Sequence, residues 1–170
     1  NYPHDLAFSS IGNHDVIAVA QRSGSICIYE KDARSDSYAD KPGFELSGAG
    51  TGLDFSDAVA FVPPDNDYVA VCNALIHNLT FYRRTPGAGI AFAMKPAYEL
   101  KHRSIDTPDG LAFSDCGQWL AVANHGNHTV SIHERRSDGR YKARPRSILR
   151  NGGLRYPHSV AFTPRTNHLV

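Results

Sequence analysis

The sequence has few cysteines, no long apolar run and no marked excess of either charge. Its 3 cysteines, at positions 27, 72 and 116, are odd in number and do not recur at a fixed spacing, which argues against a disulfide framework. No stretch approaches the ~20 consecutive apolar residues of a membrane-spanning helix. The formal net charge is +1, which is ordinary for a globular domain. These absences favour a soluble protein without membrane association.

Signals for a cellular compartment and for common catalytic chemistry are also missing. No signal peptide is visible, and the lack of a disulfide framework favours the cytoplasm. A signal peptide could precede the first residue, however, so the compartment stays unknown. The sequence contains no Gly-x-Ser-x-Gly turn for a nucleophilic serine, no P-loop and no dinucleotide fingerprint.

One hexapeptide pattern occurs four times along the chain. Pro-His-Asp-Leu-Ala-Phe occupies residues 3–8, and related hexapeptides follow at 56–61, 108–113 and 157–162. The alanines of this pattern stand at positions 7, 60, 112 and 161, so the steps are 53, 52 and 49 residues. A regular period of this size indicates a repeat architecture and defines equivalent positions in each repeat.

Each period contains four short apolar runs, bounded by Gly, Asn, Asp or Pro, and such runs predict β-strands. We expect strands at 6–8, 16–20, 26–29 and 44–46, then 59–62, 68–72, 79–82 and 98–100, and finally 111–113, 119–123, 129–133 and 147–149. No convincing helical periodicity interrupts them. Four strands in about 50 residues form the unit of a β-propeller blade.

The predicted fold is therefore an all-β propeller segment of about 3.3 four-stranded blades. The blades are expected at about 3–54, 55–106 and 107–155, with the start of a fourth at 156–170. Closed propellers have roughly 4–8 blades. We therefore expect the chain to be an internal fragment of a longer protein, or to complete its ring by self-association.

The amino-acid sequences of the repeats resemble those of one propeller family. Residues 108–124 are PDGLAFSDCGQWLAVAN and residues 127–132 are NHTVSI. These phrases resemble the repeats of lactonase-like propellers, which include 6-phosphogluconolactonase-type and YVTN-type proteins, and the Trp-Asp dipeptide of WD40 repeats is absent. The resemblance implies a small polar ligand, a sugar acid or lactone, bound at the mouth of the channel. It also implies lactone hydrolysis as the activity. The alternative is a non-catalytic propeller that acts as a protein-interaction scaffold.

Equivalent positions indicate where a ligand site could lie. The innermost strand of each blade lines the central channel, and the loops that enter it open on the ligand-binding face. The residues two before the Leu or Val of each inner strand are candidate catalytic groups: His4, Asp57, Asp109 and His158. The loops between second and third strands add candidate ligand-binding groups on the same face: Gln21, Arg22, Asn73, Asn124 and His125.

Three interpretations of this polar arc remain open. The Asp and His side chains could cap backbone amides at the turns into the strands. They could instead bind a sugar-like ligand, with an Asp or His as general base and Arg22 or His125 polarising a carbonyl. No cofactor is certain, but a divalent metal in the channel is the third interpretation. Asp and Asn oxygens would suit Ca²⁺, whereas imidazoles would suit a transition metal.

A basic segment lies in the third repeat. Between residues 135 and 155 there are eight basic residues and one acidic residue, Asp138. The basic residues are Arg135, Arg136, Arg140, Lys142, Arg144, Arg146, Arg150 and Arg155. This segment could be a solvated outer edge or a docking patch for an acidic partner. The aromatic residues that would stack on single-stranded nucleic acid are not interleaved with it, which argues against a nucleic-acid partner.

Overall fold

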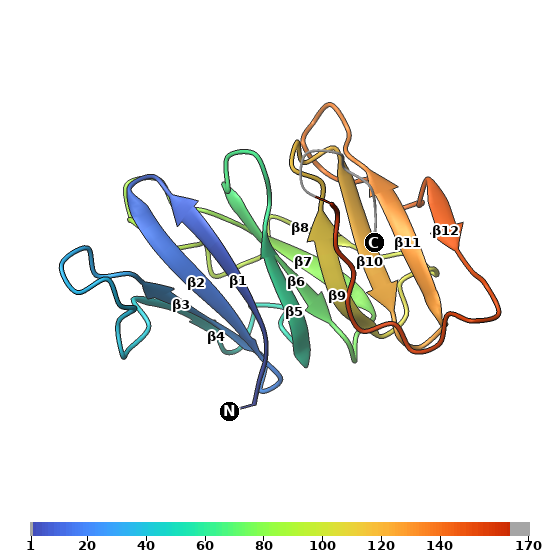
Figure 1. The fold of residues 1–170 in the computed structure, drawn as a ribbon, viewed down its shortest axis with the longest axis horizontal. Coiled ribbons are helices and arrows are strands. Elements are labelled where there is room, and N and C mark those ends of the chain that lie inside the picture. Colours follow the sequence, from blue (N-terminus) through green and yellow to red (C-terminus); the bar gives the residue numbers. More distant parts are fainter. Residues whose placement is uncertain (1, 164–170) are drawn as a thin grey trace.

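The computed structural model describes residues 2–163, which form three four-stranded antiparallel sheets and no helix (Figure 1). The first sheet contains β1 (Pro3–Ile11), β2 (His14–Gln21), β3 (Ser25–Glu30) and β4 (Phe44–Ser47). The second contains β5 (Ser56–Phe61), β6 (Tyr68–Asn73), β7 (Asn78–Arg83) and β8 (Tyr98–Leu100). The third contains β9 (Pro108–Phe113), β10 (Trp119–Asn124), β11 (Thr129–Glu134) and β12 (Ser147–Leu149). The predicted all-β fold of four-stranded blades is confirmed.

Each sheet is a meander in which every strand pairs with the next one in the sequence. The first strands of the three blades, β1, β5 and β9, lie side by side, and the outer strands fan away from them (Figure 1). This arrangement makes β1, β5 and β9 the inner strands. The loops that enter them therefore meet at one end of the channel.

Apolar side chains fill the space between neighbouring blades. A first cluster joins the inward face of the first blade to a row of buried residues on the second: Val59, Phe61, Val69, Val71 and Tyr82. A second cluster joins the second blade to the equivalent row on the third, which includes Leu111, Phe113, Leu120 and Val122. The same repeat positions thus face the preceding blade each time, because equal sequence patterns place equal side chains on the same sheet face.

A glycine turn fixes the contact between the second and third blades. Gly117 has a φ of 69°, and its amide donates to the carbonyl of Ser114, closing the turn that precedes β10. A Cβ at Gly117 would lie 2.3 Å from the carbonyl oxygen of Pro63 in the second blade. The positive φ and the close approach both require glycine here.

The segment predicted to begin a fourth blade lies beside β9 and forms none of the twelve strands of residues 2–163. His158, Ser159 and Val160 line the same groove as Gly110 and Leu111 of β9. The remainder of that predicted blade, residues 164–170, lies outside the described residues. Among those described, no helix is long and apolar enough to cross a membrane. The three cysteines are free, with Cys27 and Cys72 buried in β3 and β6 and Cys116 exposed in a turn.

Candidate ligand site at the channel mouth

The inner strands of all three blades carry an irregularity at the same repeat position. In each inner strand one residue has no paired residue on the neighbouring strand, while the residues before and after it are paired. The unpaired residue is His4 in β1, Asp57 in β5 and Asp109 in β9. A bulge of this kind re-aims the side chain of the extra residue. Three of the four candidate catalytic residues are therefore bulge residues at the channel mouth.

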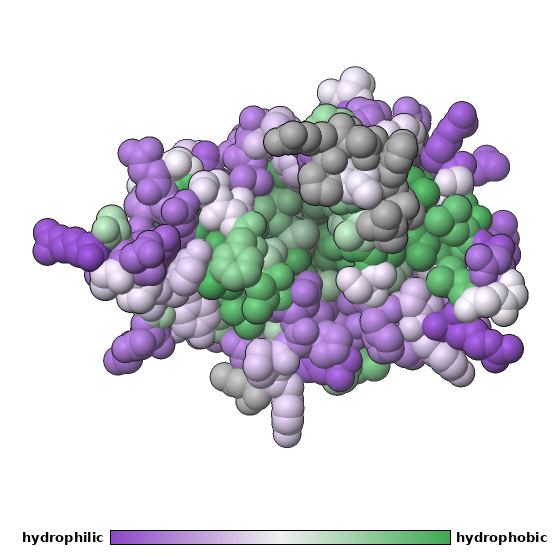
Figure 2. Space-filling model, in the orientation of Figure 1, coloured by the Kyte–Doolittle hydropathy of each residue, from purple (hydrophilic) through white to green (hydrophobic). Residues whose placement is uncertain are grey.

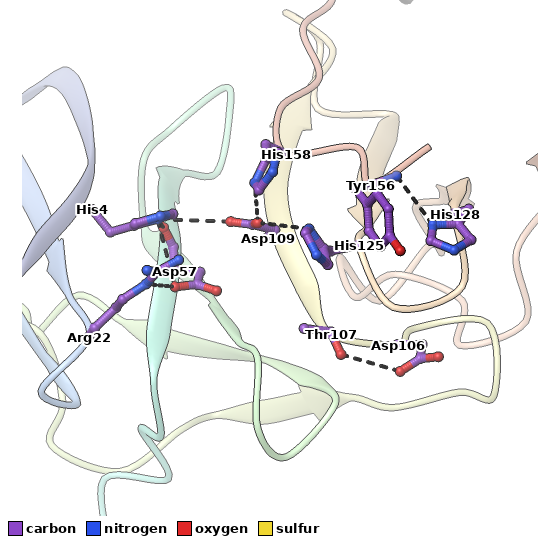
Figure 3. A network of polar contacts seen from close by, with 10 residues as sticks. All are labelled: His4, Arg22, Asp57, Asp106, Thr107, Asp109, His125, His128, Tyr156 and His158. Atoms are coloured by element: carbon purple, nitrogen blue, oxygen red, sulfur yellow. Dashed lines mark hydrogen bonds and ion pairs between the residues drawn. The ribbon is translucent and has the colours of Figure 1, made fainter. Parts of the chain in front are cut away.

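Asp57 forms one half of a polar cluster (Figure 3). Its Oδ1 accepts a hydrogen bond from Arg22 Nε at 2.7 Å, and the Arg22 guanidinium also lies 5.0 Å from the centre of the Phe55 ring. Its backbone carbonyl lies 2.9 Å from Nδ1 of His4. Because a carbonyl oxygen can only accept, Nδ1 of His4 is the donor, which leaves Nε2 of a neutral His4 free to accept a proton.

Asp109 forms the other half and lies between histidines (Figure 3). Its Oδ2 is 2.5 Å from Nδ1 of His158 and 3.5 Å from Nδ1 of His125. The rings of these two histidines are 4.8 Å apart. On the opposite side, Oδ1 of Asp109 is 3.9 Å from Nδ1 of His4, which links the two halves. The fold thus brings together His4, Arg22, Asp57, Asp109, His125 and His158, as predicted.

The two aspartates are buried, with relative exposures of 3% for Asp57 and 6% for Asp109. Within residues 2–163, the hydrogen-bond partners of their carboxylates are the side chains of Arg22 and His158 rather than backbone amides. Oδ1 of Asp109 and Nδ1 of His125 are buried without a hydrogen-bond partner among these residues. This pattern favours a ligand or metal site over the turn-capping interpretation, because a cap uses its oxygens on backbone amides.

The cluster lies along a groove with a volume of about 480 Å³. Its polar lining includes His4, Asp5, Asp57, Asp109 and His158, and its apolar lining comes from the inner strands below them, such as Leu6, Val59 and Leu111. A volume of this order suits a small molecule. Apolar walls with a few convergent polar groups are also typical of small-molecule sites.

Asp5 is a groove residue that the sequence analysis missed. It is half-buried, and its Oδ2 accepts a hydrogen bond from the amide of Val59 at 3.0 Å. Burial raises the pKa of its carboxyl above the ordinary value, although the Val59 hydrogen bond acts in the opposite direction. The signal was available, because the other repeats have Ala, Gly or Ser at the equivalent position.

Three predicted ligand-binding residues lie outside the cluster. Gln21, Asn73 and Asn124 are the last residues of β2, β6 and β10, and all three are buried. Asn73 donates to Asn78 and Thr80, while its Oδ1 accepts from the amide of Asp54.

Asn124 makes the equivalent contacts in the third blade. It donates to Ser131, and its Oδ1 accepts from the amide of Asp106. Gln21 donates to Sγ of Cys27. The two asparagines therefore fix, through these amide hydrogen bonds, the loops that lead into β5 and β9, which carry the bulge residues Asp57 and Asp109.

Two equivalent histidines hold the loop that enters β9 and the segment that follows the third blade. Nδ1 of His77 accepts from the amide of Thr107 at 2.9 Å, and Nδ1 of His128 accepts from the amide of Tyr156 at 3.2 Å. Thr107 and Tyr156 have φ values of 46° and 47°, and the equivalent Phe55 has 50°. Such left-handed residues cost roughly 1–3 kcal/mol each. The hydrogen bonds that the amides of Thr107 and Tyr156 donate to the histidines help to offset that cost at these two positions.

No model of a known protein family and no curated protein sequence matches the chain. Solved structures do resemble it. A chain of a humanized mutant of the Chaetomium thermophilum Polycomb Repressive Complex 2 matches 94% of this chain at 14% identity and a TM-score of 0.67. The WD40 domain of Toxoplasma gondii coronin matches 94% at 14% identity and 0.65. The Pseudomonas aeruginosa periplasmic gluconolactonase PpgL matches 91% at 18% identity and 0.63.

These likenesses show the fold, and the chain is a β-propeller segment with four-stranded blades. The segment spans 34%, 36% and 40% of the lengths of the three neighbours. The neighbours include a lactonase and a component of a protein complex. The fold alone therefore does not select an activity.

Proposed function

We propose that the channel mouth binds a sugar acid or its lactone and hydrolyses the lactone. The observation that carries this proposal is the pair of buried carboxylates, Asp57 and Asp109, on bulges that face an open groove. Arg22, His4, His125 and His158 surround them. Carboxylates and imidazoles accept from sugar hydroxyl groups, and a guanidinium suits a carboxylate or carbonyl oxygen.

In the proposed reaction, His4 acts as the general base. Its Nε2 takes a proton from a water molecule while Nδ1 stays bonded to the carbonyl of Asp57. The water oxygen forms a bond to the lactone carbonyl carbon, and Arg22 or His125 stabilises the negative charge on the carbonyl oxygen. The ring C–O bond then breaks, and the leaving alkoxide takes the proton back from His4. No covalent enzyme intermediate is needed.

The hydrolysis is tested with gluconolactone and a pH indicator. His4→Gln is expected to lower kcat/KM by roughly 100-fold or more, because it removes the proton acceptor. His14→Gln is the matched control, since His14 lies at the far end of β2 and contacts Glu30. Equal rates for the His4→Gln variant and the unmodified protein would overturn the proposed mechanism.

Binding is tested separately from turnover with a sugar acid. Asp109→Ala is expected to weaken binding measured by calorimetry, while the free energy of unfolding changes by about 1 kcal/mol, as for an ordinary single substitution. Circular dichroism in urea measures the second quantity. A loss of several kcal/mol without any change in binding would favour the turn-capping role instead.

A second candidate, an interaction scaffold, is favoured by a basic groove on the third blade. A cavity of about 720 Å³ lies between residues 102–104 and β12, and its lining contains Arg103, Arg144, Arg146 and Arg150 but no acidic residue. An acidic segment of a partner protein would suit it. The double variant Arg144→Glu, Arg146→Glu should abolish salt-sensitive binding of a glutamate-rich peptide, whereas Arg34→Glu in the first blade should not. Equal binding by both variants would remove this candidate.

A further inference from the structure

We propose that Asp109, His125 and His158 form a binding site for a transition-metal ion of the Zn²⁺ class. The site rests on the proposed function only for its location at the channel mouth, and it adds a ligand that the lactone proposal does not require. One ligand atom from each of the three residues lies within 4.8 Å of the others. Figure 3 shows both imidazoles joined to the Asp109 carboxylate by dashed lines, His158 from above and His125 from the right.

The donor set selects the type of ion. Two imidazole nitrogens and one carboxylate oxygen suit Zn²⁺ and its neighbours, whereas Ca²⁺ takes 6–8 oxygen ligands. Bonds of about 2.0–2.2 Å to a tetrahedral ion place the ligand atoms roughly 3.4 Å apart. Nδ1 of His125 already lies 3.5 Å from Oδ2 of Asp109. Nδ1 of His158 lies at 2.5 Å, as a hydrogen bond, so the ion would replace the proton that this contact shares.

Unused polar atoms in the cluster point independently to a ligand. Asp109 is 6% exposed, yet its Oδ1, which faces Nδ1 of His4 at 3.9 Å rather than the two imidazoles, has no hydrogen-bond partner among the described residues. Nδ1 of His125 is also buried without a hydrogen-bond partner there, and its nearest charged group is Oδ2 of Asp109 at 3.5 Å. A buried polar group without a hydrogen bond is destabilising. A bound ion would use the lone pair of His125 and neutralise the buried carboxylate.

A neighbouring trio does not make the same case. His4, Asp57 and Asp109 also place ligand atoms within 4.8 Å of one another. Asp57, however, already binds the Arg22 guanidinium at 2.7 Å, and Nδ1 of His4 is occupied by the carbonyl of Asp57. A second cation beside Arg22 would be repelled. The metal site is therefore assigned to Oδ2 of Asp109, which faces His125 and His158, and not to the side of Asp109 that faces His4 and Asp57.

The geometry leaves part of the coordination sphere open. A structural zinc site has four protein ligands, whereas a catalytic zinc site typically has three protein ligands and a water molecule. His158 is 64% exposed on its side chain and lines the groove. The remaining positions around the ion would therefore face the groove and accept water or an oxygen of a small ligand.

The test uses tag-free protein that has been treated with EDTA and dialysed. Titration with Co²⁺, followed by visible absorption, and with Zn²⁺, followed by calorimetry, is expected to give one ion per chain. His125→Ala and Asp109→Asn should weaken binding by at least roughly tenfold, because even outer residues of metal sites have effects of that size. His14→Ala is the matched control, and His4→Ala tests the neighbouring trio.

Two results would overturn the site: no binding to the unmodified protein, or equal affinity in His125→Ala and the unmodified protein. The His125 side chain is 31% exposed, so its truncation is compatible with folding, which circular dichroism checks. Sugar-acid binding is measured with and without Zn²⁺ to separate the two proposals. Sugar-acid binding to a protein that takes up no Zn²⁺ would overturn only the metal site. Zn²⁺ binding without any sugar-acid binding would support the metal site and overturn the proposed function.

Discussion

Buried polar residues inside the third blade form a continuous chain of hydrogen bonds. Asn124 donates to Ser131, Nε2 of His133 lies 3.0 Å from Oγ of Ser131, and Nδ1 of His133 lies 2.9 Å from the carbonyl of Lys142. The carbonyl requires Nδ1 to donate, so Nε2 accepts from Ser131. Both ring nitrogens of a neutral His133 are therefore hydrogen-bonded, Nδ1 as the donor and Nε2 as the acceptor.

Stability should therefore depend on the protonation of His133. Burial lowers the pKa of His133 below its ordinary 6.5, with the nearby His102 acting in the same direction and the hydrogen bond to Lys142 opposing it. Below pH 6.5 the unfolded state takes up a proton that the native state resists. The stability contributed by neutral His133 is complete above 6.5 and is lost as the pH falls towards the lowered native value.

Urea unfolding across this pH range measures the effect. His133→Gln should flatten the fall in unfolding free energy below pH 6.5, because the unfolded state of the variant gains no proton at this position. The comparison with the unmodified protein isolates His133 from the histidines of the channel mouth. A variant that keeps the full pH slope would contradict this account.

At the scale of the strand, β9 brings the segment after the third blade to the site. A Cβ at Gly110 would lie 2.3 Å from the carbonyl oxygen of His158. Backbone contacts this close are available only to glycine. The bulge directs the carboxylate of Asp109 towards the channel mouth. The absence of a side chain at Gly110 lets the backbone of His158 pack against β9.

Gly110→Ala is expected to move residues 157–160 away from β9. His158 would then lose its contact with Asp109, and Zn²⁺ affinity should fall by roughly tenfold or more. Hydrogen exchange of the amides in 157–163 measures the displacement without reference to a metal. Gly152→Ala is the matched control, because a Cβ there meets no atom within 4 Å. Equal exchange in the two variants would show that the close approach does not hold this segment.

At the scale of the whole molecule, the first blade leaves one apolar face uncovered. Leu6 and Phe8 of β1 are 54% and 65% exposed. They pair with Val19 and Ile17 on β2, so these four residues share one face of the sheet. In the second and third blades the equivalent face is buried against the preceding blade. Figure 2 shows hydrophobic surface in the middle of this view with hydrophilic residues around it.

We expect this face to bind another blade, which a second copy supplies when the 170-residue chain is studied alone. Light scattering on a sizing column should give a mass above that of one 170-residue chain. Leu6→Ser combined with Phe8→Ser should restore the monomer, because contiguous exposed apolar surface drives association. Leu75→Ser is the control, since Leu75 is 61% exposed but lies in the turn between β6 and β7. A monomeric unmodified protein would contradict this expectation.

Much of the candidate site was predictable because the repeat defines equivalent positions. The positions of His4, Asp57, Asp109 and His158 in the repeat predicted that they meet, and the structure brings them together. The roles of Asn73 and Asn124 were not predictable in the same way. A polar residue in a strand-end loop can face the channel or turn back to bind backbone amides, and only the fold distinguishes the two.

The sequence by itself determined the all-β fold, the number of strands in each blade and the arc of equivalent positions at the channel mouth. These follow from local patterns that recur with a regular period. Only the tertiary structure decided which side chains share a carboxylate, which asparagines are buried and how closely His158 approaches Gly110. Those facts depend on bulges and on contacts between segments about 50 residues apart, whose side-chain directions no local pattern specifies.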